Sequence, residues 1–225
     1  MTGSNYVQAL ALGLDPAWRR LSRDERCRSA EDFCSGVSKQ SDVTTFTYSM
    51  IGLKAGTDVL LWSLSPSLDA LEESSARTLR SGMGTWMSVR HSFLGIIRAS
   101  QYVKRPTPQE QSLFTGERSS YLIVYPFTKS ADWYLLPQDE RQKVMNEHMK
   151  VGHRYQQVRQ LLASSFGVDD MDFLVAYETD DLPAFGELVR ELRGTESRRS
   201  TVRDTPILTG IHRPLEEITR LLGAE

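Results

Sequence analysis

The feature of this 225-residue chain that most limits its fold is one order of strand-like and helix-like segments that occurs twice. Each half has a strand pattern, a helix pattern, two strands joined by a glycine turn, a second helix pattern and a last strand. From the first strand to the turn glycine, Tyr6 and Gly56 are separated by 50 positions, and Ser120 and Gly167 by 47. This βαββαβ order is that of the ferredoxin-like unit. The sequence therefore predicts an α+β protein with tandem ferredoxin-like βαββαβ repeats, of the dimeric α+β barrel type.

Residue type and turn chemistry set the segments of the first half. Threonine, aromatic and β-branched residues favour strands, and the run Lys54-Ala-Gly-Thr-Asp58 favours a hairpin turn. Ser65 and Pro66 suit the N-cap and the first position of the second helix. We expect strands at residues 6–14, 43–53, 59–64 and 85–99, and helices at residues 15–38 and 66–80.

The second half has the same kinds of signal. Pro137 and the run Asp181-Leu-Pro mark helix starts. Residues 122–125 are apolar on both faces, which predicts a central, covered strand. We expect strands at residues 120–127, 155–166, 171–178 and 201–211, and helices at residues 138–152, 181–193 and 214–222. The proline-rich and polar residues 105–119 are predicted to be a linker between residues 1–104 and residues 120–225.

Composition excludes several classes of protein. A formal net charge of −2 gives no electrostatic reason to expect a nucleic-acid partner. No apolar run approaches the roughly 20 residues that a membrane span needs, and the first residues lack the pattern of a secretory signal. The only cysteines, Cys27 and Cys34, favour reduced thiols over a disulfide framework. We therefore expect a cytoplasmic protein with neither a membrane span nor a nucleic-acid partner.

Four residues of the second half have side chains suited to redox or ligand chemistry. Tyr125 ends a predicted strand, Lys129 and Trp133 follow it closely, and His148 lies beside an apolar helix stripe. Each has an ordinary alternative: a packed tyrosine, a solvated lysine, a core tryptophan and a capping histidine. No P-loop, dinucleotide fingerprint or nucleophile elbow occurs in the sequence. From the residues alone the ordinary readings are favoured.

Longer motifs identify a family. The runs Tyr125-Pro-Phe-Thr-Lys129, Trp133-Tyr-Leu-Leu-Pro137, Glu147-His148 and Tyr177-Glu-Thr-Asp-Asp181 resemble the chlorite dismutase family, and among its members most closely the coproheme decarboxylases. The resemblance implies a cofactor or substrate that is iron-coproporphyrin III (coproheme) or haem b. It also implies that a homo-oligomer forms, with a pentamer favoured.

The same resemblance implies roles for particular residues. His148 falls on the proximal iron ligand, and Glu196 near the acidic residue that accepts a hydrogen bond from that histidine. Tyr125 falls on the catalytic tyrosine of the decarboxylases. The residues expected near the porphyrin propionates are Lys129, Arg193 and Trp133.

The other side of the haem is less clear from the sequence. Chlorite dismutases carry an arginine 13 residues after the proximal histidine, and that position here is Leu161. Its neighbour Gln160 would replace it only through a bulge or gap, because a shift of one residue along a strand turns a side chain to the opposite face. Leu161 and Gln160 are therefore the two distal candidates, and the leucine disfavours chlorite chemistry.

The function that the resemblance implies is peroxide-dependent oxidative decarboxylation of coproheme propionates to vinyl groups, through a radical at Tyr125. Coproheme and hydrogen peroxide would then be the partners in the reaction. One alternative is a haem protein that resembles chlorite dismutases or peroxidases. Another is a haem-binding or haem-transfer protein without catalysis.

Overall fold

The computed structural model describes residues 5–38, 42–98, 102 and 117–225. The chain divides into two compact units. Unit 1 consists of Met1–Ile97 with Leu208–Glu225, and unit 2 of Arg98–Ile207. Most of the predicted linker at 105–119 lies outside the described residues.

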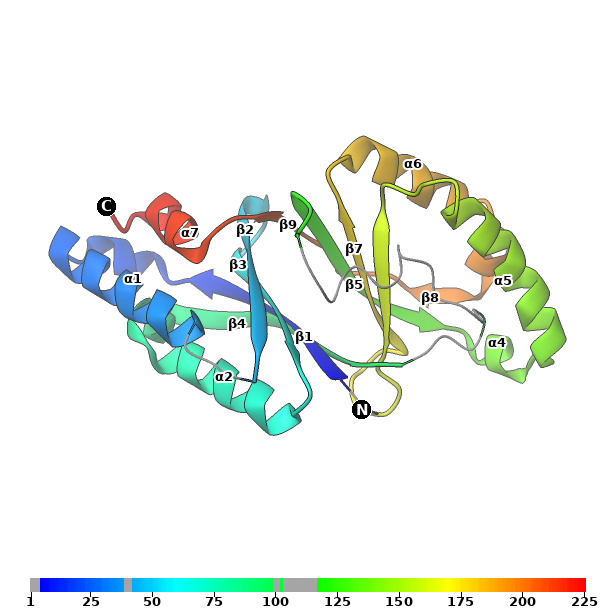
Figure 1. The fold of residues 1–225 in the computed structure, drawn as a ribbon, viewed down its shortest axis with the longest axis horizontal. Coiled ribbons are helices and arrows are strands. Elements are labelled where there is room, and N and C mark those ends of the chain that lie inside the picture. Colours follow the sequence, from blue (N-terminus) through cyan, green and yellow to red (C-terminus); the bar gives the residue numbers. More distant parts are fainter. Residues whose placement is uncertain (1–4, 39–41, 99–101, 103–116) are drawn as a thin grey trace. The chain divides into compact units, whose positions relative to one another are not determined.

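Unit 1 is an antiparallel sheet with helices on one face (Figure 1). Its sheet has the order β4-β1-β3-β2-β9. Its elements are β1 (Asn5–Leu14), η1 (Pro16–Arg20), α1 (Arg23–Ser38), β2 (Thr44–Lys54), β3 (Thr57–Ser65), α2 (Leu68–Arg80), η2 (Gly82–Trp86), β4 (Met87–Ile97), β9 (Leu208–His212) and α7 (Leu215–Leu222).

The space between sheet and helices in unit 1 is filled by apolar side chains. Trp18, Phe33 and Met83 are fully buried, and they pack with leucines of β1 and with Ile218 of α7. Gly84 allows η2 to approach α2 closely, because a Cβ atom at this position would lie 1.9 Å from the carbonyl oxygen of Thr78. The helices and the sheet of unit 1 are therefore packed together through these side chains.

Unit 2 is built on a second antiparallel sheet, with the order β6-β7-β5-β8. Helices α5 and α6 lie on one face of it (Figure 1). Its elements are β5 (Tyr121–Lys129), α4 (Ala131–Leu135), α5 (Gln138–Gly152), β6 (Arg159–Ser164), β7 (Phe173–Thr179), α6 (Leu182–Leu192), η4 (Glu196–Ser200) and β8 (Thr201–Arg203). The prediction of a central strand at 122–125 is confirmed, since β5 lies between β7 and β8 and Leu122, Ile123 and Val124 are buried.

The single last strand expected at 201–211 is wrong. Residues 201–203 form β8, which pairs with β5, whereas residues 208–212 form β9, which pairs with β2 of unit 1. Pro206 lies between them and has no N–H to donate to a ladder, so the strand is interrupted there. As a result the chain from Leu208 onward belongs to unit 1 and not, as expected, to the second half.

Two smaller expectations are also corrected. The N-cap of α2 is Ser67, whose hydroxyl accepts from the N–H of Ala70 at 3.2 Å, while Ser65 donates to the carbonyl oxygen of Asp42. The strand expected at 155–166 is shortened to β6, because Tyr155 and Val158 form a turn in which the N–H of Val158 donates to the carbonyl of Tyr155. None of the described helices is long and apolar enough to cross a membrane.

A buried ion network fixes how β6, β7 and the start of β5 fit together. Glu178 of β7 is fully buried, and its carboxylate accepts from Arg159 of β6 at 2.8 Å and lies 3.5 Å from Arg118. Arg159 also donates to the hydroxyl of Ser119 at 2.9 Å and to the carbonyl of Glu117 at 3.1 Å. Because Arg159 and Glu178 face each other in the ladder, this contact holds the strand register.

We expect Glu178→Ala to lower the free energy of unfolding by about 3–5 kcal/mol, because it leaves arginine charge buried without its carboxylate. Urea unfolding followed by circular dichroism measures this. The matched control is Glu187→Ala in α6, which breaks an exposed ion pair with Arg190 and should change stability little. Equal effects of the two substitutions would contradict the assigned role of Glu178.

Candidate functional site

The strand register places three polar side chains on the helix-covered face of the unit 2 sheet. Tyr125 lies opposite Val175 of β7, and Tyr177 lies opposite Gln160 of β6. Residues 175 and 177 are two apart on one strand and so share a face. Val175 and Tyr177 pack against Leu188 of α6, which identifies this face as the one under the helices. Tyr125, Tyr177 and Gln160 therefore all point toward α5 and α6.

Leu161 lies on the opposite face of the same sheet. It pairs with Ala176 and is only 5% exposed, and Ala163 next along this face is fully buried. Of the bulge or gap expected for Gln160, the strand has no bulge: β6 pairs with β7 without a register shift and turns Gln160 to the side of Tyr125. The residue that shares this face with Gln160 is Leu162, which is 49% exposed although helices cover the face.

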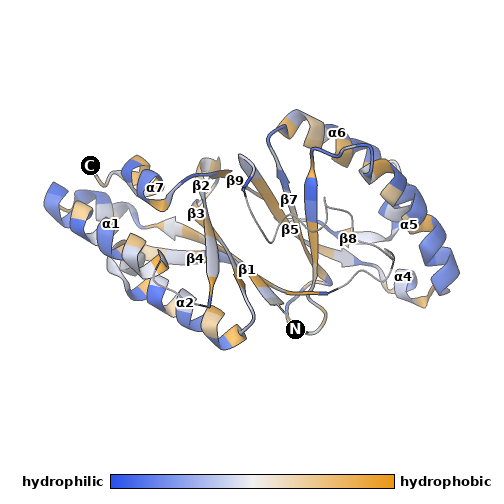
Figure 2. Cartoon of the chain, in the orientation of Figure 1, coloured by the Kyte–Doolittle hydropathy of each residue, from blue (hydrophilic) through white to orange (hydrophobic). Residues whose placement is uncertain are grey.

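Helix α5 is packed less tightly than a helix on a sheet normally is. None of its 15 residues, all of them in the described part of the chain, is buried, whereas α1 of unit 1 buries Phe33, Cys34 and Val37 among others. Figure 2 shows α5 mainly in hydrophilic colours. Its half-buried residues recur at helical spacing: Arg141, Gln142, Val144, Met145, His148, Met149, Val151 and Gly152. This stripe and the exposed Leu162 are what a helix and sheet present when the group that fills the space between them is a ligand.

His148 is neutral and incompletely satisfied at this position. Burial, followed by the charge of Lys129, lowers the pKa of His148 from 6.5 to about 4, against the opposing effect of Glu147. Its Nδ1 atom is buried and has no hydrogen-bond partner among the described residues. A buried polar atom without a partner costs about 1–3 kcal/mol. A neutral imidazole is the form that binds a metal ion.

The expected acceptor for His148 is engaged elsewhere. The carboxylate of Glu196 pairs with the guanidinium of Arg199 at 3.1 Å, and its side chain is 57% exposed. The backbone N–H of Glu196 instead donates to the carboxylate of Glu147, the neighbour of His148, at 3.1 Å. Glu196 is thus held beside α5 by its backbone, with its carboxylate turned outward.

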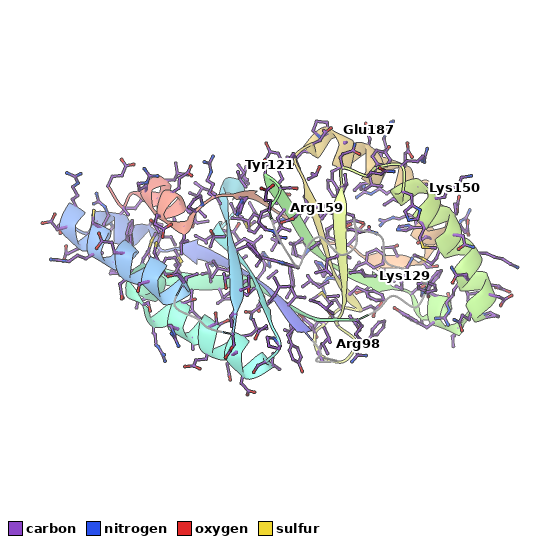
Figure 3. All side chains as sticks on the ribbon, viewed as in Figure 1. Arg98, Tyr121, Lys129, Lys150, Arg159 and Glu187 are labelled. Carbon is purple, nitrogen blue, oxygen red and sulfur yellow. The ribbon has the colours of Figure 1, made fainter. Side chains whose placement is uncertain are left out.

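Lys129 is buried rather than presented at an open surface. It is 8% exposed, and its Nζ atom donates to the carbonyl and hydroxyl oxygens of Ser197 at 2.7 and 2.9 Å. The same atom lies 4.5 Å from the ring centroid of Trp133 and 5.4 Å from that of Phe127. Burial and the nearby charge of Arg198 lower the pKa of Lys129 to about 8. The ring of Trp133 therefore packs against the ammonium group of Lys129, the residue that Figure 3 labels.

Tyr125 is a neutral phenol in a mixed electrostatic environment. Burial is the main cause that raises its pKa well above 10, and the neighbouring Tyr177 adds to the shift. Asp204 also raises this pKa, while Arg193 lowers it, so these two charges lie near the phenol. Arg193 is exposed and lies at the C-cap of α6.

The structure adds site residues that the sequence did not single out. Asp172 accepts hydrogen bonds from the backbone N–H of Lys129 and the hydroxyl of Tyr134, both at 2.7 Å. It thereby ties the end of β5 to α4 and to the β6–β7 hairpin, and raises the pKa of Tyr134 well above its usual range together with burial. The pairing of Gln160 with Tyr177 was accessible in principle, because the Gly167 turn fixes which residues of the two strands face each other.

Comparison with protein families and curated proteins gives consistent relatives. A family model described as chlorite dismutase matches residues 23–213. A coproheme decarboxylase from Mycolicibacterium smegmatis is 29% identical over 192 residues, which are 83% of this chain and 82% of that protein.

Solved structures extend the similarity to the whole fold. The structure of chlorite dismutase from Candidatus Nitrospira defluvii in complex with imidazole has a TM-score of 0.88 and 27% identity, and the match covers 98% of this chain and 95% of that chain. A mutant of the same organism's chlorite dismutase has a TM-score of 0.90 and 26% identity, over 100% of this chain and 97% of that chain. Because the family model also spans most of its length, the chain belongs to the chlorite dismutase family.

Proposed function

We propose that this protein binds an iron porphyrin between α5 and the unit 2 sheet and uses it for peroxide-dependent decarboxylation of coproheme to haem b. The observation that carries the proposal is that no residue of α5 is buried, while His148 on this helix has a buried Nδ1 atom without a hydrogen-bond partner among the described residues. The similarity to a curated coproheme decarboxylase supports the choice of substrate.

The residues present fit an iron porphyrin better than a bare metal ion. No cluster of three or more His, Cys, Asp or Glu side chains that could hold a metal ion occurs in the described parts of the chain. An iron porphyrin would supply most of the metal's ligands itself, and His148 would supply the one that the protein must add. Half-buried Val144 and Met145 and exposed Leu162 offer apolar contact to a flat ring. When bound, the iron porphyrin supplies one-electron oxidation driven by hydrogen peroxide.

Tyr125 is the hydrogen-atom relay in this reaction. Its phenol is neutral, so it can lose an electron and a proton together and become a neutral radical. The radical takes a hydrogen atom from the β-carbon of a propionate, which restores the phenol. The second oxidising equivalent of the same peroxide would take one further electron from the propionate, which loses carbon dioxide and becomes a vinyl group; a second propionate would react in the same way with a second peroxide.

Cationic side chains orient the propionates. Arg193 is exposed and close enough to Tyr125 to act on its pKa, so a propionate that pairs with Arg193 lies near the phenol. The ammonium group of Lys129 donates to two oxygens of Ser197 and makes no hydrogen bond to a carboxylate within the described parts of the chain. A bound carboxylate would therefore compensate a buried charge at Lys129. Glu196 accepts the hydrogen bond of His148 after its carboxylate leaves Arg199.

Gln160 is the distal group that meets the peroxide. It is the only one of the two distal candidates on the same face as Tyr125, and its side-chain amide can donate a hydrogen bond to a peroxide oxygen. Chlorite chemistry is the rival activity, since the solved structures similar in fold include chlorite dismutases. Oxygen release from chlorite by the haem form would favour that rival.

The two units are repeats of one ferredoxin-like unit. In both, the strands lie in the order fourth, first, third, second: β4-β1-β3-β2 in unit 1 and β8-β5-β7-β6 in unit 2. We place the protein in the cytoplasm and infer a homo-oligomer, with a pentamer favoured. Both free cysteines agree with a reducing compartment.

The first test replaces the phenol. Tyr125→Phe should bind coproheme as the wild type does but give no haem b when peroxide is titrated, because phenylalanine cannot supply the hydrogen-atom relay. Product mass and the Soret band measure both steps. Tyr155→Phe is the control, since its hydroxyl bonds to Glu191 away from Tyr125. Full turnover by Tyr125→Phe would overturn the mechanism.

The second test separates the distal candidates. Gln160→Leu should slow the reaction of the coproheme-loaded protein with peroxide by about 10²-fold, because it removes a donor to the reacting oxygen. Leu161→Met, which conserves volume on the opposite face, should leave that rate within about twofold. Stopped-flow absorbance at the Soret band gives both rates. The reverse pattern would show that the register does not decide the distal role.

The third test concerns the buried charge of Lys129. Its pKa falls from 10.5 to about 8 on folding, so between pH 8 and 10.5 the unfolded chain binds more protons and stability rises with pH. Relative to Lys129→Met, the wild-type protein should gain on the order of 2–3 kcal/mol across this window and nothing below pH 8. Urea unfolding without coproheme measures the difference, with Lys150→Met on the exposed side of α5 as control. A flat difference would mean that Lys129 is solvated.

A further inference from the structure

We propose that Tyr177 is a positioning residue for Tyr125, and that the two phenols share the radical by exchanging a hydrogen atom. The inference rests on the proposed function, because the radical must first form at Tyr125. It assigns a role to a residue for which the sequence motifs gave none.

The geometry brings the two phenol rings together on one sheet face. Tyr125 lies opposite Val175 and Tyr177 opposite Ile123, so the tyrosines are diagonal neighbours on adjacent strands. Their ring centroids are 6.1 Å apart and their planes differ by 25°, which is a stacked arrangement. Side chains at diagonal positions reach each other when they are aromatic.

In the proposed pair a hydrogen bond joins the hydroxyl groups of these two neighbouring rings. Burial raises the pKa of both phenols; interaction with Tyr177 raises that of Tyr125 further, while interaction with Tyr125 acts to lower that of Tyr177, as expected when Tyr125 is the donor. Tyr177 is only 5% exposed, and its ring also lies 5.2 Å from that of Phe185 on α6. The second phenol is therefore shielded from water and from added reductants, while the first remains half-buried.

The exchange needs no further reactant. The O–H bond of Tyr177 breaks, its hydrogen atom moves to the oxygen of the Tyr125 radical, and the O–H bond of Tyr125 forms. The products are an intact Tyr125 and a radical on Tyr177, with no change in charge. Because both partners are phenols, the step is close to thermoneutral, and the surroundings of each ring decide where the radical rests.

This arrangement has a consequence for a substrate with two reactive propionates. An oxidising equivalent that reaches Tyr125 before a propionate is in place can move to Tyr177 and return. Tyr177 also lies directly opposite Gln160, whose Cβ is about 5 Å away in such a pair, so the shared radical lies beside the proposed peroxide site.

The test is electron paramagnetic resonance of the coproheme-loaded protein, frozen within milliseconds of mixing with peroxide. In wild-type protein the tyrosyl radical should have the low largest g value of a hydrogen-bonded phenoxyl. In Tyr177→Phe the radical should remain on Tyr125 with a larger g value, because the donor is gone. In Tyr125→Phe no radical should appear on Tyr177, because the exchange starts from a radical on Tyr125.

The outcomes separate the inference from the proposed function. A wild-type radical whose g values are unchanged in Tyr177→Phe, as they should be in the control Tyr155→Phe, would overturn the inference alone. A wild-type protein that forms no tyrosyl radical and no haem b would overturn the proposed function, and the inference with it.

A measurement without the porphyrin tests the hydrogen bond itself. In protein labelled with ¹³C at tyrosine Cζ, the Tyr125 resonance should move in Tyr177→Phe and stay in place in Tyr155→Phe. Replacing tyrosine by phenylalanine keeps the ring that packs against Phe185, and circular dichroism confirms the fold. An unmoved Tyr125 resonance in folded Tyr177→Phe would show that the phenols are not bonded.

Discussion

The register between β6 and β7 is the constraint on which the rest of unit 2 depends. A shift of one residue would turn Gln160 away from the helices and bring Leu161 under them. The contact between Arg159 and the fully buried Glu178 opposes such a shift, because it would separate a buried carboxylate from its partner. Tyr125, Tyr177 and Gln160 lie on one face of the sheet, and the ion network lies on the other. The ion network on one face thus fixes the strand register that places the candidate residues on the other face.

The face that carries the candidate site is stabilised less than its counterpart in unit 1. In unit 1, Trp18, Phe33 and Met83 fill the space below the helices. In unit 2, none of the 15 residues of α5 is buried against the sheet. A helix normally gains most of its stability from a buried apolar stripe. The buried charge of Lys129 adds a further cost, which two hydrogen bonds to Ser197 offset in part. A bound porphyrin with propionates would restore this missing stability, because a ligand that binds only the folded state stabilises it by mass action.

Sequence patterns predicted the elements well where local signals were sufficient. Helix α5 begins and ends where expected, and the glycine turns at Gly56 and Gly167 have the positive φ angles that favour glycine. The last strand was not divided in the prediction, although Pro206 interrupts residues 201–211, because the different partner strands of β8 and β9 are set by the sheet and not by local sequence. The side to which Gln160 points also depends on pairing, and no property of residue 160 itself reveals it. The positions of Tyr125 and His148 came from motifs, whereas the pair of Tyr125 with Tyr177 required the sheet.

Burial lowers the pKa of His148 and raises that of Tyr125, and in both cases it favours the neutral form. For an imidazole, burial disfavours the protonated form, and the charge of Lys129 acts in the same sense, so His148 stays neutral and its lone pairs remain available. For a phenol, burial disfavours the ionised form, so Tyr125 keeps the hydrogen atom that a relay must give up. Both groups are therefore in the protonation state that the proposed reaction needs before any ligand arrives. Lys129 beside His148 and Tyr177 beside Tyr125 shift these pKa values in the same directions as burial does. The packing of the sheet and helices, and not the porphyrin, therefore preorganises the site.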